Sequence, residues 1–373
     1  MGLDEIIAGV NKQYGKGTLL RANEAKSLVM SRIPTGIFDL DVKLGGGLPR
    51  GRITTLKGDF STGKSAITIK TAGQAQRHCR ICGKQFEYVD MLGEVHSTDC
   101  FCGKREPMRV VMLDAEHSFD PNWAEKWGVD VENTYVIQTE YAEQAIDVAD
   151  ACIRSHECDF LIVDSIAALT PSVEIEESAE KWQMGVMARL MNKALRKWTS
   201  AINSYGMESN QACTIALINQ MRVNLGGYHP TPTSPGGRGI DFFQSAEVRF
   251  KKVDYITTKG SDRPLGIEVE FVVKKNKTWP ILPGGKFKMY FVGTRGSYSV
   301  GDTNNDEQVL RAAAYWNLVD KTGSWYTFPN GEKAQGDVNA AKILRTDPDL
   351  LRDLEDLVKE RELSWAQDLN DEK

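Results

Sequence analysis

The sequence predicts an α/β fold built around a mostly parallel sheet. Apolar runs with strand character alternate with helix-like segments from residue 33 to about residue 300, and runs such as FLIVD and TIALIN show no alternation of polar and apolar residues. Strands that are apolar on both faces are typical of a parallel sheet covered by helices on both sides. A Gly-rich turn between one such strand and the next helix indicates the same architecture.

The composition is that of an ordinary globular protein. The 373 residues are 41% hydrophobic and carry a net charge of −5. No run approaches the roughly 20 apolar residues of a membrane span, and the first residues lack the pattern of a secretory signal, so we expect an intracellular protein. Residues 347–373 hold ten acidic and four basic side chains, which leaves +1 for residues 1–346. Basic patches that bind an anionic partner are therefore compatible with the charge.

The N-terminal region predicts a small helical arm. Leu3, Ile6, Ile7 and Val10 have helical spacing, which predicts an amphipathic helix over 3–14 ahead of a Gly-rich break. An arm of this length does not fold alone.

The central region contains the strands of the sheet and the helices that cover it. Strands are expected over 53–57, 110–113, 160–164, 214–220, 246–256, 266–274 and 286–293. Helices are expected near 64–76, 121–127, 142–155 and 184–204. Residues 226–239 are rich in Gly, Pro and Thr, which predicts a surface loop without a packed element. Residues 306–373 have the pattern of a smaller α-rich unit.

Four of the seven cysteines lie in one insertion, residues 79–104, which interrupts the step from a helix to the next strand. An odd total and this crowding do not fit a disulfide framework, whereas C-x-x-C is a good half-site for a metal. Our hypothesis is a structural Zn²⁺ held by Cys79, Cys82, Cys102 and either Cys100 or His96. The alternative is free thiols in a loop. Cys152, Cys158 and Cys213 have apolar surroundings, and we expect them in the core.

The strongest motif is G-x-x-x-x-G-K-[ST] between a strand and a helix. Its eight members are Gly58, Asp59, Phe60, Ser61, Thr62, Gly63, Lys64 and Ser65. Amide groups of such a turn, at the positive end of a helix, surround phosphates, and Lys64 adds a positive charge. The Ser65 hydroxyl is expected to ligate Mg²⁺. The alternative is a chance Gly-rich turn.

Acidic residues follow two of the expected strands. Asp164 ends FLIVD and is expected to hold Mg²⁺ opposite Ser65; the alternative is a residue that caps a turn. Glu116 lies just beyond the strand over 110–113, and we expect it to orient and deprotonate a water that attacks the γ-phosphate. Both acids lie where α/β proteins bind ligands, at the carboxyl ends of strands.

Several long motifs in a fixed order resemble one known family. They are NKQYGKG (11–17), PTGIFDLDVKLGGGLPRGRI (34–53), the phosphate loop, LDAEHSFDP (113–121), LIVDSIAALTP (161–171), MGVMARLMNKALRK (184–197), INQMR (218–222), VVKKNK (272–277) and GSWYTFPNGEKAQG (323–336). Together they resemble the bacterial and phage RecA-type recombinases over most of the chain. The resemblance implies a RecA-like P-loop core over 34–300 and an oligomerisation arm over 1–33 that packs on the neighbouring subunit. It also implies a small α+β C-terminal domain with an acidic tail over 301–373. A self-packed helix is the alternative for the arm.

The resemblance also assigns roles around the nucleotide. It implies that Glu116 is the catalytic acid that activates water, and that Asp120 and Trp123 hold the adenine, although the family usually has Tyr at the second position. Gln220 corresponds to a γ-phosphate sensor; the alternative is a polar residue at a strand end. ATP and Mg²⁺ are the implied cofactors.

Two lysines complete the implied catalytic set. Lys275 and Lys277 match family lysines that reach across the subunit boundary to the γ-phosphate of the neighbour, which makes hydrolysis depend on assembly. The alternative is a pair of solvated lysines in a basic run.

Two DNA-binding loops are implied, over 171–189 and 222–241. The matching positions are Met184, Gly185, Arg189 and Arg196 in or near the first loop, and Arg222, Gly236, Gly237 and Arg238 in the second. A plain amphipathic helix is the alternative for 184–198. Arg238 replaces a common Asn and Asp241 a frequent Lys, so we expect the same function with a changed response to salt.

We therefore expect an ATP-dependent DNA recombinase that forms filaments on single-stranded DNA and exchanges strands with homologous duplex in DNA repair. Its partners would be single- and double-stranded DNA, further copies of the chain, and single-strand-binding and mediator proteins. Its location would be the cytoplasm of a bacterium or of a phage-infected host. One alternative is a ring-forming P-loop motor, such as a helicase or a signalling ATPase. Another is an ATP-gated DNA-binding scaffold with little hydrolysis.

Overall fold

The structure is a computed structural model that places most of the chain. It describes residues 2–15, 18–21, 31–90, 93–176, 185–204, 211–224, 231–233, 236–237, 239–258, 260, 262–294 and 297–371. Met184 and Arg238, both expected at DNA, lie outside the described residues. The chain forms two compact units, Met1–Ser31 and Arg32–Lys373.

The first unit contains the predicted N-terminal helix, α1 (Leu3–Tyr14). Glu5 Oε2 accepts a hydrogen bond from the Gly2 amide at 3.1 Å, which satisfies a donor at the start of the helix. Asn11 exchanges two hydrogen bonds with the backbone of Leu19 at 2.8 and 3.0 Å, so the chain beyond the helix folds back on it. No residue of α1 is buried.

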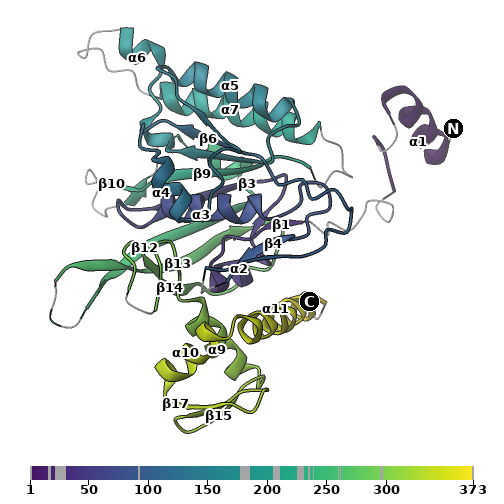
Figure 1. The fold of residues 1–373 in the computed structure, drawn as a ribbon. Coiled ribbons are helices and arrows are strands. Elements are labelled where there is room, and N and C mark those ends of the chain that lie inside the picture. Colours follow the sequence, from purple (N-terminus) through teal and green to yellow (C-terminus); the bar gives the residue numbers. More distant parts are fainter. Residues whose placement is uncertain are drawn as a thin grey trace. The chain divides into compact units, whose positions relative to one another are not determined.

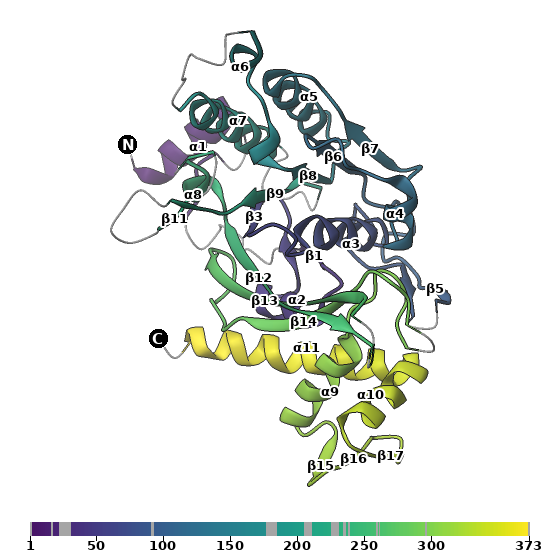
Figure 2. The same cartoon turned by 90° about the vertical axis from the view of Figure 1, so that its left-hand side faces the viewer.

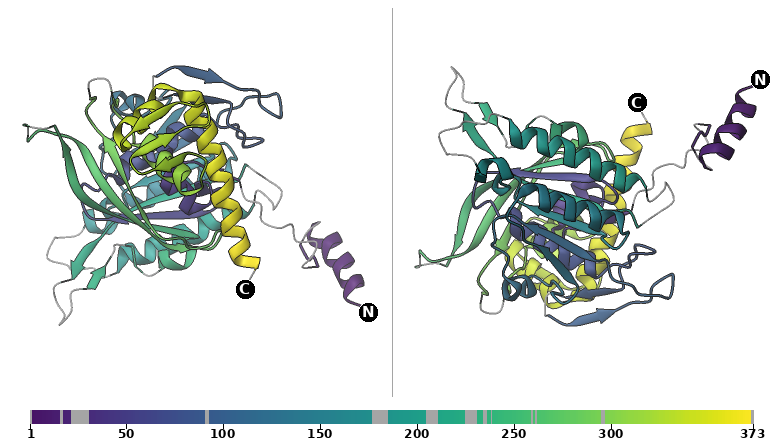
Figure 3. Two further views of the ribbon diagram at one scale, coloured as in Figure 1. Left: turned by 90° about the horizontal axis from the view of Figure 1, so that it is seen from below. Right: turned by 90° about the horizontal axis from the view of Figure 1, so that it is seen from above.

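The second unit is built on an eight-stranded sheet (Figure 1). Its strands, in spatial order, are β14 (Gly285–Tyr290), β13 (Pro264–Asn276), β12 (Ala246–Thr257), β3 (Ile53–Gly58), β9 (Thr214–Gln220), β8 (Phe160–Asp164), β6 (Val110–Asp114) and β7 (Thr134–Ile137). Every pair from β12 to β7 is parallel, whereas β12, β13 and β14 pair antiparallel. The mostly parallel sheet is therefore confirmed. β12 pairs with β3 only over Ala246–Phe250, and its remainder continues in the antiparallel part of the sheet with β13, which pairs in turn with β14, green in Figure 3.

Helices cover both faces of the sheet, as the apolar strands require. Alternate residues of β6 enter different cores: Val110 and Met112 pack with α3 (Lys64–Gln76), whereas Val111 and Leu113 pack with α5 (Ala142–Arg154) and α7 (Val186–Asn203). Figure 2 shows α5 and α7 together on one face and α3 on the other. The short helix α4 (Pro121–Lys126) lies on the α3 side, where Ala124 joins the first core.

Shorter elements connect these parts. They are β1 (Arg32–Ile33), α2 (Phe38–Leu44), β2 (Leu48–Pro49), a 3-10 turn (Ile166–Ala168), α6 (Ser172–Glu176) and α8 (Gly239–Phe243). Residues 226–239 were expected to lack a packed element. This expectation is wrong for β11 (Thr231–Thr233), because this strand pairs antiparallel with β10 (Arg222–Asn224). Two threonines with β propensity flank Pro232 here, and a two-stranded ribbon leaves the proline's missing donor outside any larger sheet.

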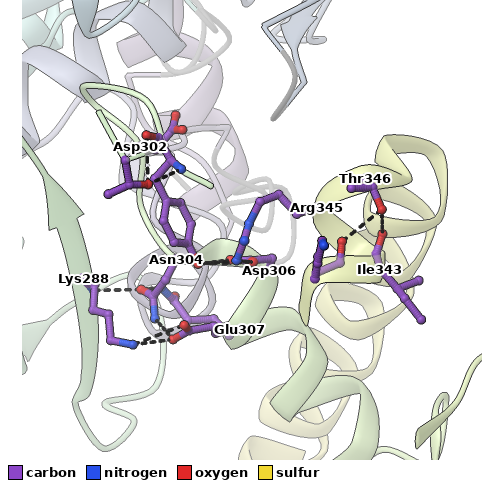
Figure 4. Close-up of polar contacts among 12 residues, drawn as sticks. Lys288, Asp302, Asn304, Asp306, Glu307, Ile343, Arg345 and Thr346 are labelled. Carbon is purple, nitrogen blue, oxygen red and sulfur yellow. Dashed lines mark hydrogen bonds and ion pairs between the residues drawn. The ribbon is translucent and has the colours of Figure 1, made fainter. Parts of the chain in front are cut away.

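The C-terminal part combines helices with a small sheet. It contains α9 (Asn305–Tyr315), β15 (Asp320–Thr322), β16 (Trp325–Thr327), β17 (Lys333–Gln335), α10 (Asp337–Thr346) and α11 (Pro348–Asp371). Its apolar core includes Phe38 and Val42 of α2, so it packs directly against the start of the core domain. Figure 4 shows Arg345 of α10 reaching the fully buried Asp306 at 2.5 Å, which joins α10 to α9. Among the described residues, no helix is both long and apolar enough to cross a membrane.

Candidate functional site

The Gly-rich motif forms a tight turn between β3 and α3, as predicted. A Cβ at Gly58 would lie 2.5 Å from the Phe250 carbonyl oxygen, and Gly63 has φ of 79°, so both positions require glycine. Thr62 Oγ1 donates to the Asp59 carbonyl at 3.0 Å and holds the turn closed. The turn therefore presents amide groups at the N-terminal end of the 13-residue helix α3, which is an anion-binding arrangement.

Lys64 lies inside this turn. Its Nζ donates to the carbonyl oxygens of Gly58 at 3.0 Å and Asp59 at 2.6 Å. Burial lowers the pKa of Lys64, while the charge of Asp164 acts in the opposite direction. A phosphate bound in the turn would place negative charge next to the Lys64 ammonium and stabilise its charged form.

Ser65 and Asp164 meet as predicted at the carboxyl end of β8. The Ser65 hydroxyl donates to the Asp164 carboxylate. Burial, together with the carboxylates of Glu116 and Asp114, raises the pKa of Asp164 to about 6 despite that hydrogen bond. Hydroxyl and carboxylate oxygens are the ligands that Mg²⁺ prefers, so Ser65 and Asp164 beside the phosphate turn fit a magnesium ion.

Glu116 is held by side chains from two neighbouring strand ends. Ser165 Oγ donates to Glu116 Oε1 at 2.6 Å, and Gln220 Nε2 donates to the same oxygen at 3.0 Å. No described residue donates a hydrogen bond to Oε2, and the side chain is exposed. The carboxylate is thus oriented through one oxygen while the other is free to accept a proton from water.

Gln220 connects this carboxylate to the chain that leads into residues 222–241. It lies opposite Gly58 in the register of β9 and β3, and the next amide, that of Met221, donates to the Gly58 carbonyl at 3.1 Å. A change at the phosphate turn would therefore reach this segment directly. Ser165 was not among the predicted site residues, although it follows Asp164 in a motif that pointed to the site.

The expected adenine residues have structural roles. Asp120 Oδ1 accepts hydrogen bonds from the amides of Asn122 and Trp123 at 2.9 and 3.3 Å and caps α4. The Trp123 ring packs against Trp127 and Phe291, with centroids 5.4 and 6.1 Å away. Their contact with a base stays a prediction.

The two expected DNA loops meet at α7. Gly185 is the N-cap of α7 with φ of 80°, and Arg189 and Arg196 are exposed on that helix, whose other face is buried. A Cβ at Gly237 would lie 2.8 Å from the Cβ of Ala188, so the second loop passes close to α7. Gly236 also has a positive φ, of 87°. Arg222 begins β10.

Lys275 and Lys277 contact the helix that ends the second loop. Lys275 Nζ donates to the carbonyl of Asp241, and Lys277 Nζ donates to the carbonyl of Phe242 at 3.3 Å. Both carbonyls lie in α8. Two charged neighbours here, the buried Lys57 and Glu247, were not predicted, because they lie 190 positions apart in the sequence.

The four clustered cysteines form a compact group. The Sγ distances are 3.5 Å for Cys79 and Cys102, 3.2 Å for Cys82 and Cys100, and 3.3 Å for Cys100 and Cys102. All four sulfurs lie within 4.8 Å of one another. Four thiolates around Zn²⁺ at about 2.3 Å would be about 3.8 Å apart, so the group fits a tetrahedral zinc site.

Local turns create this geometry. The Gly83 amide donates to the Cys79 carbonyl at 2.8 Å, and the Gly103 amide donates to the Cys100 carbonyl at 3.0 Å, both glycines having positive φ. Each turn brings its two cysteines to one side of the backbone.

His96, the alternative fourth ligand, lies elsewhere in the insertion. It is on a hairpin of β4 (Glu87–Val89) and β5 (Val95–Ser97), where its Nε2 lies 2.8 Å from Asp90 and its ring stacks on Tyr88. The alternative with His96 as a ligand is therefore wrong for this structure. Cys158 and Cys213 are buried as expected, and Cys152 is partly buried.

A strand, a phosphate turn, a helix and acids at the ends of adjacent parallel strands define a P-loop nucleoside triphosphatase. Comparison with known proteins identifies the particular family: the chain belongs to the RecA family. The RecA N-terminal domain matches residues 1–96 and 96–294, and the RecA C-terminal domain matches residues 307–362. The first match is divided at residue 96, inside the cysteine insertion.

Curated relatives match nearly the whole chain. Protein RecA of Amycolatopsis mediterranei is 34% identical over 96% of this chain and 91% of the relative. Protein RecA of Fusobacterium nucleatum is 33% identical over 95% and 83%, and Protein RecA of Acinetobacter baylyi is 31% identical over 98% and 93%. Family membership supports a function in DNA recombination and repair.

Proposed function

We propose that this protein is a DNA-dependent ATPase that assembles on single-stranded DNA and couples ATP hydrolysis to pairing and strand exchange with homologous duplex. The observation that carries the proposal is the position of Glu116, held on one oxygen by Ser165 and Gln220 beside the phosphate turn. An oriented carboxylate at this point is suited to activate water against a terminal phosphate.

The site residues divide the work of hydrolysis. The amides of the turn and Lys64 bind the phosphates, while Ser65 and Asp164 would hold a magnesium ion, which supplies charge neutralisation when bound. Glu116 accepts the proton of the attacking water, and its bond to Gln220 links the γ-phosphate to the second loop. Lys275 and Lys277 then act in trans on the γ-phosphate of the neighbouring subunit.

DNA contacts follow from the family and from exposed cations. Arg189 and Arg196 are solvent-accessible on α7, and the glycines of the second loop allow close approach of the backbone to phosphate. The arm over 1–33 would pack on a neighbouring subunit, in line with the exposure of Leu3 and Ile6 in its own unit. Contacts with the DNA phosphates do not distinguish one base sequence from another, so homology is recognised by base pairing between the DNA strands.

We also infer that the cysteine cluster binds one structural Zn²⁺ through Cys79, Cys82, Cys100 and Cys102. Thiolates at near-tetrahedral spacing on two tight turns support this assignment. Native mass spectrometry of protein purified without chelator tests it, with a mass increase of one zinc expected and its absence contradicting the assignment.

The deciding experiment is ATP hydrolysis with and without single-stranded DNA, beside a Lys64→Ala control. Strong stimulation by DNA that the control abolishes supports the proposal. ATP hydrolysis at the same rate with and without DNA would favour a ring-forming motor. An absence of hydrolysis, together with DNA binding that ATP strengthens, would favour a scaffold.

A further inference from the structure

The first turn of the cysteine cluster carries a buried arginine. Arg80 lies between Cys79 and Cys82, but its side chain points into the protein and is only 7% exposed. Its Nε donates to Asp159 Oδ2 at 3.0 Å, and its Nη2 donates to the His156 carbonyl at 2.6 Å. The cysteine cluster therefore has a direct polar connection to the core.

Asp159 joins the beginnings of three central strands. It is fully buried and immediately precedes β8. Its backbone amide donates to the Arg109 carbonyl, just before β6, at 3.0 Å, and its carbonyl accepts from the Thr214 amide of β9 at 2.8 Å. The opposite ends of these strands carry the nucleotide-site residues Glu116, Asp164 and Gln220.

The Asp159 carboxylate depends on few partners. Besides Arg80, it accepts hydrogen bonds from Arg50 Nη2 at 3.2 Å and from the Arg109 amide at 2.9 Å. Arg50 Nη1 donates in turn to the Arg80 carbonyl at 3.2 Å, so the backbone of the cysteine turn is part of the same network. Loss of Arg80 would leave this buried carboxylate with Arg50 as its one cationic partner among the described residues, which would destabilise the fold.

We propose that the metal-loaded cysteine cluster is a structural clamp on the ATPase core, which acts through Arg80 and sets the stability of the central sheet. Metal bonds to Cys79 and Cys82 fix the turn that places the guanidinium against Asp159. Without metal, the turn keeps its backbone hydrogen bonds, such as that from the Gly83 amide to the Cys79 carbonyl, but the contacts among the thiols are weak. The buried ion pair then loses the support of the metal bonds. The clamp rests on the zinc assignment proposed above and is independent of the proposed ATPase mechanism.

The test combines metal content with thermal unfolding of the full chain. Zinc is measured by elemental mass spectrometry, and unfolding is followed with and without a zinc-selective chelator in excess Mg²⁺. We expect chelation to lower the melting temperature of the wild-type chain by about 5 °C or more. Arg80→Met should retain zinc, melt at a lower temperature, and lose most of the chelator effect.

Further variants separate the possible causes. Cys82→Ser should lose zinc and the chelator effect together. Lys104→Met is the matched control, because Lys104 is an exposed cation of the same insertion, and it should behave as wild type. Arg80→Lys keeps a positive charge, so we expect it to lower the melting temperature and the chelator effect by less than Arg80→Met does. This variant replaces Arg80→Met in the test if Arg80→Met does not fold.

Two results would overturn the clamp. If Arg80→Met and Arg80→Lys melt as wild type, or show the full chelator effect, then the metal does not act through Arg80, although zinc is bound. If the wild-type chain contains no zinc, the metal assignment fails and the clamp fails with it. DNA-stimulated ATP hydrolysis by the same preparation tests the proposed function separately.

Discussion

The buried ammonium of Lys57 lies 2.9 Å from the Asp241 carboxylate, which connects the strand before the phosphate turn to α8, the helix that ends the second loop. Glu247 is a second partner of Lys57, also at 2.9 Å, and Gln244 donates to Glu247 at 2.6 Å. Asp241 was expected to change the response of DNA binding to salt, because it replaces a frequent Lys. Within this ion pair its charge is instead compensated by Lys57, so any effect on DNA binding would be smaller than the substitution alone suggests.

Asp241→Asn tests this connection. The change removes one of two carboxylates around a buried lysine, and we expect a loss of about 1 to 2 kcal/mol in the free energy of unfolding. We also expect weaker stimulation of ATP hydrolysis by DNA with unchanged basal turnover, because the contact between α8 and β3 loses its ion pair. Denaturant unfolding and ATPase assays measure both. Asp254→Asn, an exposed acid on β12, is the control, and equal effects in the two variants would contradict the connection.

Glu116→Gln tests the role of the oriented carboxylate. The amide keeps the shape of the side chain but cannot accept the proton of water, so kcat should fall by about 10²- to 10⁴-fold. DNA binding that depends on ATP should persist, because the phosphate turn is intact. Filter binding and steady-state ATPase assays separate these outcomes. Full turnover in the variant would assign the proton to another group.

Asp164 gives the chain a specific dependence on pH. Its folded pKa, raised by burial to about 6, lies above its unfolded value near 3.8, so the folded chain binds more protons between these values. The protonated Asp164 therefore stabilises the folded chain. This contribution to the free energy of unfolding, at most about 3 kcal/mol, is fully present below about pH 4 and is lost as the pH rises through 6. Unfolding of the nucleotide-free chain between pH 4 and 8 measures this component. Asp164→Asn should lack it, and identical profiles would contradict the assignment.

The phosphate site was predictable because its signals are local in sequence or follow from parallel topology. Gly58 to Ser65 are contiguous, and Glu116 and Asp164 follow strands whose carboxyl ends meet at one edge. The pairs of Lys57 with Asp241 and of Arg80 with Asp159 join residues 184 and 79 positions apart. No periodicity links such residues, since their pairing depends on packing that only the folded chain defines. For the same reason, His96 was plausible as a ligand until the structure placed it beside Asp90.

Mixed filaments test whether Lys275 and Lys277 act in trans. A Glu116→Gln subunit has no active site of its own but can lend its lysines to a neighbour. A Lys275→Met/Lys277→Met subunit retains Glu116 but cannot complete the site of a neighbour. If the lysines act across the boundary, an equal mixture should recover DNA-stimulated turnover that neither variant has alone, because about a quarter of random junctions pair an intact carboxylate with intact lysines. Mixing Glu116→Gln with Lys64→Ala is the control and should recover none, since neither subunit has a working nucleotide site. An inactive first mixture would place the lysines in cis, where their present bonds to the Asp241 and Phe242 carbonyls would be their functional contacts.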